Sequence, residues 1–220
     1  MKKVIIVGSG AVAAEITSFI SDHNKNIAPK DKLYLEGYLD FNENIEKYWR
    51  RYSLKKPVIS DIYSYKIRND EDNFIIAVAD LPFRLKMIDY LVSVKASITN
   101  FIHYSAIVGN NVEIGVGNII YPNCVIGPSA SLGNYNFITS YSFISHDCRI
   151  GNNNFFATAG VCGHVRIGNN NAFGIRSTVL PHVSIGSENT IQAGMIVDKN
   201  LNDGTTVYYR YKEQVFFVRS

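Results

Sequence analysis

An apolar residue recurs at every sixth position through the second half of this 220-residue chain. The series runs from Ile102 to Cys162, drops one residue, and resumes from Ile167 to Val197, which makes seventeen apolar positions without an exception. A small or amide residue usually stands two places before the apolar one, and glycine often follows it. A six-residue period matches neither a helical turn of roughly 3.6 residues nor the alternation of a single strand, so it indicates a repeat architecture. We expect three hexads to form one triangular coil with the apolar residue inside, and the coils to stack as parallel strands over residues 98–200.

The first 97 residues have a different rhythm, in which stretches of strand and helix composition alternate. A β-branched run from Val4 to Val7 ends at Gly8-Ser9-Gly10, and a helical stretch follows over 11–20. Residues 33–39 and 74–79 have the composition of further strands, and residues 81–92 have that of a helix. This alternation predicts an α/β domain over 1–97 that contains a small parallel sheet. Residues 201–220 then form a C-terminal extension, in which 208–211 and 215–218 suggest a β-hairpin.

Bulk properties argue against several classes of partner. The net charge of +3 is too small to indicate a basic face for nucleic acid. The N-terminal apolar run is broken by Gly8-Ser9-Gly10, unlike a secretory signal, and no stretch approaches the ~20 apolar residues of a membrane span. The three cysteines form no CxxC pair, and Cys148 and Cys162 fall at inward positions of the repeat, so we expect reduced thiols that are poor nucleophiles. These features predict a cytoplasmic protein without nucleic-acid or membrane partners.

The Gly8-Ser9-Gly10 loop is the first candidate for chemistry. Glycines at a strand-to-helix turn let backbone N–H groups approach a phosphate, and the helix N-terminus adds a partial positive charge. Asp40 closes the second predicted strand, where a carboxylate can accept hydrogen bonds from a sugar or a base. The same residues are equally compatible with a tight turn and a turn aspartate that bind nothing.

Ser145-His146-Asp147 is the second candidate, and the segment 160–165 is the third. The hexad frame places His146 at a solvated corner, where its imidazole can take up or release a proton near neutral pH. The neighbouring carboxylate of Asp147 can orient the ring. The alternative is that the histidine at this corner has no chemical role. Because adjacent residues of a strand face opposite sides, His146 and Asp147 can pair only if a turn brings both side chains to the same side. In 160–165 the register slips by one residue, which either exposes the N–H of Gly163 to a developing oxyanion or is a harmless deletion.

The remaining histidines do not predict a metal site. His164 and His182 lie one coil apart, but no third histidine is close in sequence to either of them. His103 falls at the start of the β-helix, where we expect a structural role. A three-histidine zinc site, as in metal-dependent enzymes of this architecture, lacks its third ligand, so we expect no metal.

Together the motifs resemble the sialic acid O-acetyltransferase-like sugar acyltransferases, which include N-acetyltransferases of nucleotide-linked 4-amino-4,6-dideoxy sugars. The resemblance covers nearly the whole chain and is carried by the segments VIIVGSGAVAAEI, GYLD, NFIHYSAIVG, ISHDCRIGNNN, GVCGHVRIGNNNAFG and TVLPHVSIG. It implies a Rossmann-like α/β N-terminal domain followed by an all-β, left-handed parallel β-helix. That handedness is an exception to the right-handed crossovers usual between parallel strands.

The resemblance also implies roles for particular residues. His146 is the catalytic base and Asp147 its supporting acid. The nucleotide sugar is held in the N-terminal domain by Gly8, Ser9, Gly10 and Asp40. Acetyl-CoA lies in a groove between the subunits of a homotrimer, against Gly163, Gly174, Ala193 and Gly194, and the N–H of Gly163 holds the thioester oxygen.

These roles predict an acetyl-CoA-dependent N-acetyltransferase of surface glycan biosynthesis. Its acceptor is a nucleotide-linked amino sugar, and transfer is direct, without an acyl-enzyme. Two alternatives stay open on the sequence. One is O-acetylation of a sugar hydroxyl, as on a sialic acid or a polysaccharide unit. The other is a non-catalytic trimeric β-helix protein.

Overall fold

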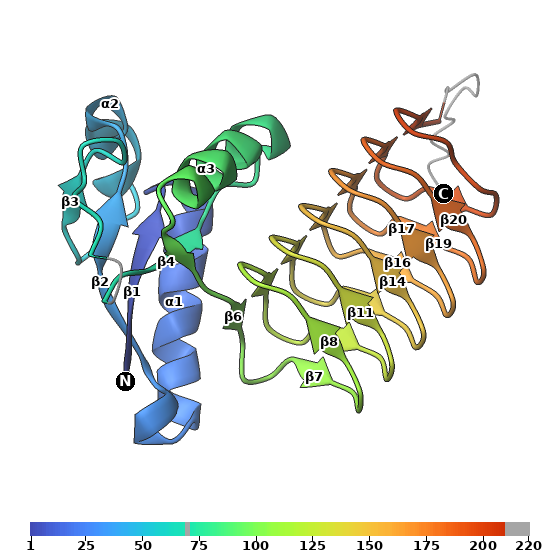
Figure 1. Cartoon of the computed structure of the whole chain (residues 1–220), viewed down its shortest axis with the longest axis horizontal. Coiled ribbons are helices and arrows are strands. Elements are labelled where there is room, and N and C mark those ends of the chain that lie inside the picture. Colours follow the sequence, from blue (N-terminus) through green and yellow to red (C-terminus); the bar gives the residue numbers. More distant parts are fainter. Residues whose placement is uncertain (69–70, 210–220) are drawn as a thin grey trace, which may run out of the picture.

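The computed structural model describes residues 1–68 and 71–209, which form an N-terminal α/β region followed by a column of stacked coils (Figure 1). The α/β region is built on a five-stranded parallel sheet with strand order β3-β2-β1-β4-β5. Its elements are β1 (Lys2–Val7), α1 (Ala11–Asn26), a 3-10 turn (Pro29–Asp31), β2 (Leu33–Leu39), α2 (Asn42–Asn44), a π-helical turn (Ile45–Trp49), β3 (Val58–Ser60), β4 (Asn73–Ile76), α3 (Leu81–Ser93) and β5 (Ser97–Ile98). The predicted alternation of strands and helices is confirmed, with the short strands β3 and β5 added at the two edges. None of the helices in the described part of the chain combines the length and apolar character needed to cross a membrane.

The central strand β1 brings the glycine loop to the carboxyl edge of the sheet. Val4 to Val7 are buried, as expected for a central strand of a parallel sheet covered on both faces. β1 pairs with β2 on one side and with β4 on the other. The chain therefore leaves β1 at Gly8, between the carboxyl ends of its two neighbours. The Gly8 N–H donates to Leu39 O at 2.8 Å, which ties the start of the loop to β2.

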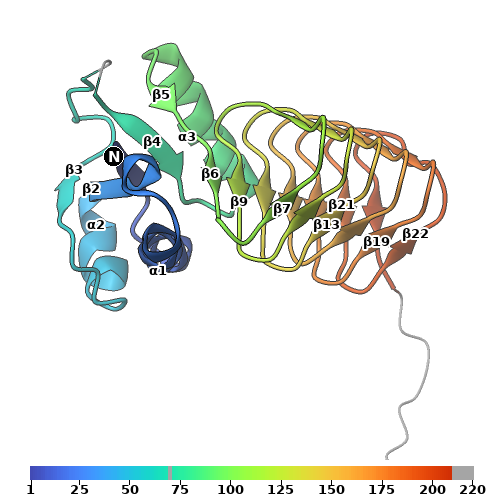
Figure 2. The same cartoon turned by 90° about the horizontal axis from the view of Figure 1, so that it is seen from below.

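The coils form a triangular column with three parallel sheets, seen from another side in Figure 2. Face 1 consists of β6 (Phe101–Ile102), β9 (Ile119–Ile120), β12 (Phe137–Ile138), β15 (Phe155–Phe156), β18 (Ala172–Phe173), β21 (Thr190–Ile191) and β23 (Thr206–Val207). Face 2 consists of β7 (Ile107–Val108), β10 (Val125–Ile126), β13 (Phe143–Ile144), β16 (Gly160–Val161), β19 (Thr178–Val179) and β22 (Ile196–Val197). Face 3 consists of β8 (Glu113–Ile114), β11 (Ser131–Leu132), β14 (Arg149–Ile150), β17 (Arg166–Ile167) and β20 (Ser184–Ile185). Each strand pairs in parallel with the strand one coil away, an arrangement consistent with the predicted left-handed β-helix.

The second residue of each strand points into the column, as the hexad pattern predicts. These side chains are buried from Ile120 to Val197, whereas Val108, in the first coil, is 42 % exposed because no earlier coil covers it. The prediction is wrong at one place. The missing residue lies in the corner between β15 and β16, so that the inward side chain after Phe156 is the fully buried Val161 and not Cys162. Cys162 is only partly buried, while Cys148 is buried in a corner.

A ladder of buried asparagines closes the corner between face 3 and face 1. Its members are Asn118, Asn136, Asn154, Asn171 and Asn189. Asn136 shows the pattern: its Nδ2 donates to Asn118 Oδ1 at 3.1 Å and to Gly151 O at 2.9 Å. Its Oδ1 accepts from the backbone N–H and from Nδ2 of Asn154, both at 3.0 Å. Since buried polar groups must find partners, the ladder explains the recurring amide two places before the apolar residue.

The column continues beyond its predicted end at residue 200. β23 (Thr206–Val207) pairs in parallel with β21, so Val207 still belongs to face 1. Residues 208 and 209 carry no strand, and the rest of the predicted β-hairpin, from residue 210 onward, lies outside the described residues.

Polar side chains join the α/β region to the first coils. Arg84 on α3 is buried and donates to the carbonyl oxygens of Ile76, Val78 and Tyr135, the last at 2.8 Å across the boundary. Burial lowers the pKa of Arg84 to about 10. On α1, Glu15 accepts a hydrogen bond from the Tyr121 hydroxyl at 2.9 Å. The two regions therefore pack as one body.

Candidate active site

The corner between face 2 and face 3 places His146 and Asp147 side by side at the surface. β13 ends at Ile144, and Asp147 then adopts a left-handed backbone with φ 57°. Aspartate tolerates this region better than most residues do. The Asp147 N–H donates to Pro128 O, one coil earlier, at 3.1 Å. This turn brings two neighbouring side chains to the same side, which a regular strand would not do.

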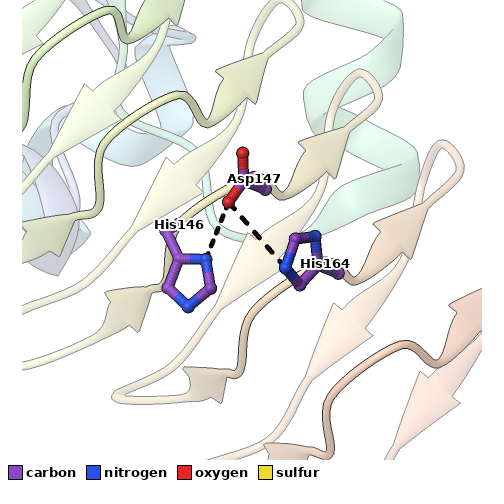
Figure 3. A group of neighbouring side chains, drawn as sticks. All are labelled: His146, Asp147 and His164. Atoms are coloured by element: carbon purple, nitrogen blue, oxygen red, sulfur yellow. Dashed lines mark hydrogen bonds and ion pairs between the residues drawn. The ribbon is translucent and has the colours of Figure 1, made fainter.

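His146 and Asp147 form a hydrogen-bonded pair. Nδ1 of His146 lies 2.8 Å from Oδ2 of Asp147 (Figure 3). An ionised carboxylate can only accept, so the pair favours the tautomer with the proton on Nδ1 and a free lone pair on Nε2. About half of each side chain is exposed, so substrate can reach the ring. The predicted pairing is therefore present in the structure, and its geometry suits a general base.

His164 lies next to this pair, because the deletion before β16 shifts the register of the corner by one residue. The His164 N–H donates to His146 O, and the His182 N–H donates to Gly163 O, each at 3.1 Å. His164 therefore occupies the left-handed position below Asp147, with φ 60°, and His182 repeats it one coil later, with φ 65°. Nε2 of His164 is 3.9 Å from Oδ2 of Asp147.

Three histidines thus gather at one corner, which corrects the expectation that His164 and His182 have no third histidine near them. The rings of His146 and His164 meet edge to face at 5.1 Å, and those of His164 and His182 stack at 4.9 Å. The sequence did place His164 and His182 one coil apart, but it did not show that the missing residue would bring His164 next to Asp147 and the His146 ring. His103 does not belong to the corner of His146, His164 and His182, because it lies at the start of the coils. It is buried beside Asp22 of α1, with its Nε2 3.4 Å from the carboxylate, as its structural role predicts.

Gly163 lies directly beneath the His146 ring. A Cβ at this position would be 2.7 Å from Cε1 and 2.8 Å from Nε2 of that ring. The Gly163 N–H donates to no carbonyl or side chain of the described residues. Prolines occupy the equivalent place in other coils, at Pro128 and Pro181, so the fold does not require a donor here. The Gly163 N–H therefore has no partner among the described residues, and its role toward an oxyanion stays a prediction.

The other predicted acetyl-CoA contacts lie on a different edge of the column. Gly174, Ala193 and Gly194 occupy the corner between face 1 and face 2, whereas Gly163 lies at the opposite edge of face 2. A Cβ on Gly174 would be 2.5 Å from the Ala193 N atom, so these two residues stack in consecutive coils. One chain alone does not bring the four residues together.

Two arginines that the sequence analysis did not single out lie on face 3 beside the His146 corner. Arg149 and Arg166 start β14 and β17 and pair directly across the two strands. They line a shallow groove of about 350 Å³ together with residues 150, 151, 167, 168 and 185. Like charges placed opposite each other destabilise a sheet, unless an anion is bound between them. The only signal in the sequence was their outward position, one place before the inward residue.

The glycine loop is braced from within the protein. Gly8 has φ 102°, and a Cβ there would lie 3.1 Å from Ala77 O. Ser9 is fully buried, and both its N–H and its hydroxyl donate to Oδ2 of Asp40. Oδ1 of Asp40 accepts from the Phe41 N–H and from Asn44 Nδ2, each at 2.7 Å. These four donors fill the acceptor sites of the carboxylate. Ser9 and Asp40 therefore hold the loop in place: the carboxylate has no acceptor left for a ligand, and the buried Ser9 has already used both of its donors.

Gly10 is different, because a Cβ there would meet no atom within 4 Å. It precedes α1 with an ordinary φ of −80°, and no side chain of the described residues caps the helix. The first-turn N–H groups of α1 therefore open toward solvent. Close by, apolar side chains of β1, β2 and α3 line a small pocket, among them Val7, Leu39, Phe41 and Phe83.

No family model and no curated protein matches the sequence. Several solved structures match its fold. The acetyltransferase domain of PglB from Neisseria gonorrhoeae FA1090 superposes with a TM-score of 0.79 at 18 % identity, over 94 % of this chain and 96 % of that one. PerB from Caulobacter crescentus, in complex with CoA and GDP-perosamine, superposes with a TM-score of 0.79 at 22 % identity, over 94 % and 93 %.

WeeI from Acinetobacter baumannii AYE matches with a TM-score of 0.74 at 19 % identity, over 94 % of this chain and 96 % of that one. The chain has the fold of these proteins. The likeness covers 94 % of this chain and so extends through the α/β region as well as the coils.

Proposed function

We propose that this protein is an acetyl-CoA-dependent N-acetyltransferase whose acceptor is a nucleotide-linked amino sugar of the 4-amino-4,6-dideoxy type. The observation that carries the proposal is the His146–Asp147 pair with the free N–H of Gly163 beneath the ring. This pair stands in a fold shared with the PglB acetyltransferase domain and with PerB, which was solved with CoA and GDP-perosamine. A non-catalytic β-helix would have no need of a base and an oxyanion donor at one corner.

The geometry supports direct transfer. Nε2 of His146 takes the proton from the amine as its nitrogen attacks the thioester carbonyl, and Asp147 stabilises the imidazolium through Nδ1. The Gly163 N–H stabilises the negative charge that develops on the carbonyl oxygen. When the tetrahedral intermediate collapses, the C–S bond breaks and the His146 imidazolium returns its proton to the departing CoA thiolate, which leaves as the free thiol. Burial raises the pKa of the Cys148 thiol, which makes it a poor nucleophile and argues against an acyl-enzyme.

The amino-sugar nucleotide binds at the carboxyl edge of the N-terminal sheet. β1 lies where the strand order reverses, with β2 on one side and β4 on the other, as in Rossmann-like sheets. The N–H groups at Gly10 and the first turn of α1 receive the phosphates, and Ser9 and Asp40 keep the loop in position.

Acetyl-CoA binds between subunits of a homotrimer. On face 2, the outward side chains of Ile107, Val125 and Phe143 are apolar and exposed in consecutive coils, with Ile107 at 64 %, and Ile196 is 61 % exposed beyond Gly160 and Thr178. Contiguous apolar surface of this kind indicates contact with a protein. A second copy against face 2 allows the corner of Gly174, Ala193 and Gly194 in one subunit to face the Gly163 corner of another. Arg149 and Arg166 are placed to receive phosphates of the cofactor.

The test is a screen of 4-amino sugars linked to UDP, dTDP, GDP or CMP, with acetyl-CoA, in which release of the CoA thiol is followed. One acceptor should support turnover, and His146→Asn should lose at least ~100-fold of it while the protein stays folded, as expected for a general base. The true acceptor at 100 times its Kd should also add about 2.7 kcal/mol of stability. Full turnover by His146→Asn would rule out the base. A product that hydroxylamine cleaves would show ester formation and contradict N-acetylation.

Gly10→Val tests whether the N-terminal region binds the nucleotide sugar while the coils bind acetyl-CoA. An added Cβ meets no atom within 4 Å, so we expect the fold to be unaffected, while the side chain occupies the space where the phosphates approach. The apparent affinity for the nucleotide sugar should fall by an order of magnitude or more, as read by calorimetry, while acetyl-CoA affinity should barely change. Equal weakening of both ligands in a well-folded variant would contradict the placement.

A further inference from the structure

The three side chains at the His146 corner have the composition of a transition-metal site. Nδ1 of His146 and Nε2 of His164 both face Oδ2 of Asp147, at 2.8 Å and 3.9 Å (Figure 3). One potential ligand atom from each of the three residues lies within 4.8 Å of the other two. A tetrahedral Zn²⁺ with bonds of about 2.1 Å holds its ligand atoms about 3.4 Å apart. The observed spacing therefore needs only small rotations of exposed side chains.

We propose that His146, Asp147 and His164 bind Zn²⁺ or a similar imidazole-preferring metal ion, and that this binding inhibits the protein. Two imidazoles and one carboxylate would leave a fourth position for water. Imidazole ligands favour zinc, copper and nickel over magnesium and calcium, which prefer oxygen. Arg149 and Arg166, each two residues beyond Asp147 and His164, bring positive charge to this side. The affinity for the metal ion must therefore come from the bonds to the three ligands, because the neighbouring charges repel a cation.

Metal binding and catalysis exclude each other at His146. The pair with Asp147 keeps the imidazole proton on Nδ1 and leaves Nε2 free to act as a base. A metal ion on Nδ1 takes that lone pair, so the proton of a neutral imidazole moves to Nε2. The nitrogen that would accept the proton of the amine is then already protonated. This consequence rests on the proposed function, whereas the binding itself does not.

His164 provides a clean variant. In the first coil the same left-handed corner position is filled by Asn111, with φ 59°. His164→Asn therefore fits the backbone and removes one ligand, while the His146 and Asp147 side chains and the hydrogen bond between them are kept. His182→Asn is the matched control, because its ring stacks on that of His164 but is not part of the three-residue cluster.

The experiment is calorimetric titration of Zn²⁺ into the full-length protein, with Co²⁺ absorption as a second readout of coordination. The wild type and His182→Asn should bind one ion per chain, and His164→Asn should bind at least tenfold more weakly. Mg²⁺ in excess should not compete. In the transfer assay, Zn²⁺ should inhibit the wild type reversibly, and His164→Asn should remain active at the same metal concentration.

Equal affinities of the wild type and His164→Asn would overturn the proposal, as would an equal loss in His182→Asn. Because calorimetry needs no acceptor, tight Zn²⁺ binding without any transfer activity would leave the metal site standing and refute the proposed function alone. Transfer activity that Zn²⁺ leaves unchanged, in a protein that binds it at this corner, would refute the inhibition.

Discussion

Replacing Gly163 with alanine changes one contact and leaves the backbone free to keep its conformation. Gly163 has no positive φ, and prolines hold the same place at Pro128 and Pro181, so the turn accepts a side chain. The added methyl group would lie 2.7 Å from Cε1 of His146. Carbon atoms in good contact are about 3.5 Å apart or more, so the ring must move by about 0.8 Å.

A shift of this size at a general base has a large effect on rate. A displacement of about 1 Å can cost roughly 100-fold, so Gly163→Ala should lower kcat/KM by about 10- to 100-fold, or about 1.4 to 2.7 kcal/mol. The assay is CoA release with saturating acetyl-CoA and the acceptor from the nucleotide-sugar screen. Thermal unfolding should change little, because the ring is half exposed and can turn toward solvent.

A double-mutant cycle separates ring placement from other effects. In the His146→Asn background the base is already absent, so adding Gly163→Ala should cost less than about twofold further, a strong departure from additivity. Gly204→Ala is a control at a glycine outside the proposed sites with open space around it, although its φ of 68° adds some backbone strain. Wild-type kcat/KM in a folded Gly163→Ala variant would refute the reasoning, and so would additive losses in the double mutant.

Three further predictions concern stability and assembly. Asn136→Ala removes four side-chain hydrogen bonds from the ladder and should cost about 4 kcal/mol of unfolding free energy at about 1 kcal/mol each, whereas Asn100→Ala removes two and should cost about 2. If urea titrations showed equal losses of unfolding free energy for the two variants, the hydrogen bonds of the ladder would not explain the stability. Burial lowers the pKa of His103 and that of the neighbouring His23, so the unfolded chain binds protons that the folded protein resists. Stability should therefore fall as the pH drops below about 6.5, and a flatter profile is expected for His103→Gln. Phe143→Glu should convert a particle of about three times 24.6 kDa into single chains in light scattering; a monomeric wild type would refute the trimer.

The sequence alone determined the architecture, because the information is local and repeated. The inward residue and the corner residue can be identified within each hexad separately. Few folds have a six-residue period, and here it is maintained from Ile102 onward. Strand and helix composition in the first half likewise matched β1, β2, β4 and α3 to within a few residues, whereas α1 continues to Asn26, beyond its predicted end at residue 20. The edge strands β3 and β5 were missed, since two or three residues carry too little pattern to be recognised.

Tertiary structure decided the site, because its geometry depends on which residues stack across coils. The count of hexads revealed that one residue was missing but placed the gap beyond Cys162. Hydrogen bonds between coils place it before β16 instead, and this shift sets His164 below Asp147 and Gly163 below His146.

Asp40 is a second residue whose role the sequence could not decide without the tertiary structure. The motif Tyr38-Leu39-Asp40 predicted an acidic group at the right edge of the sheet, and the structure places it there. Whether a carboxylate is free for a ligand depends on its neighbours in space, and Ser9, Phe41 and Asn44 fill every acceptor site. Periodicity identifies which residues point inward or reach a corner, whereas the partners that each one meets come from segments distant in the chain, and only folding brings these together.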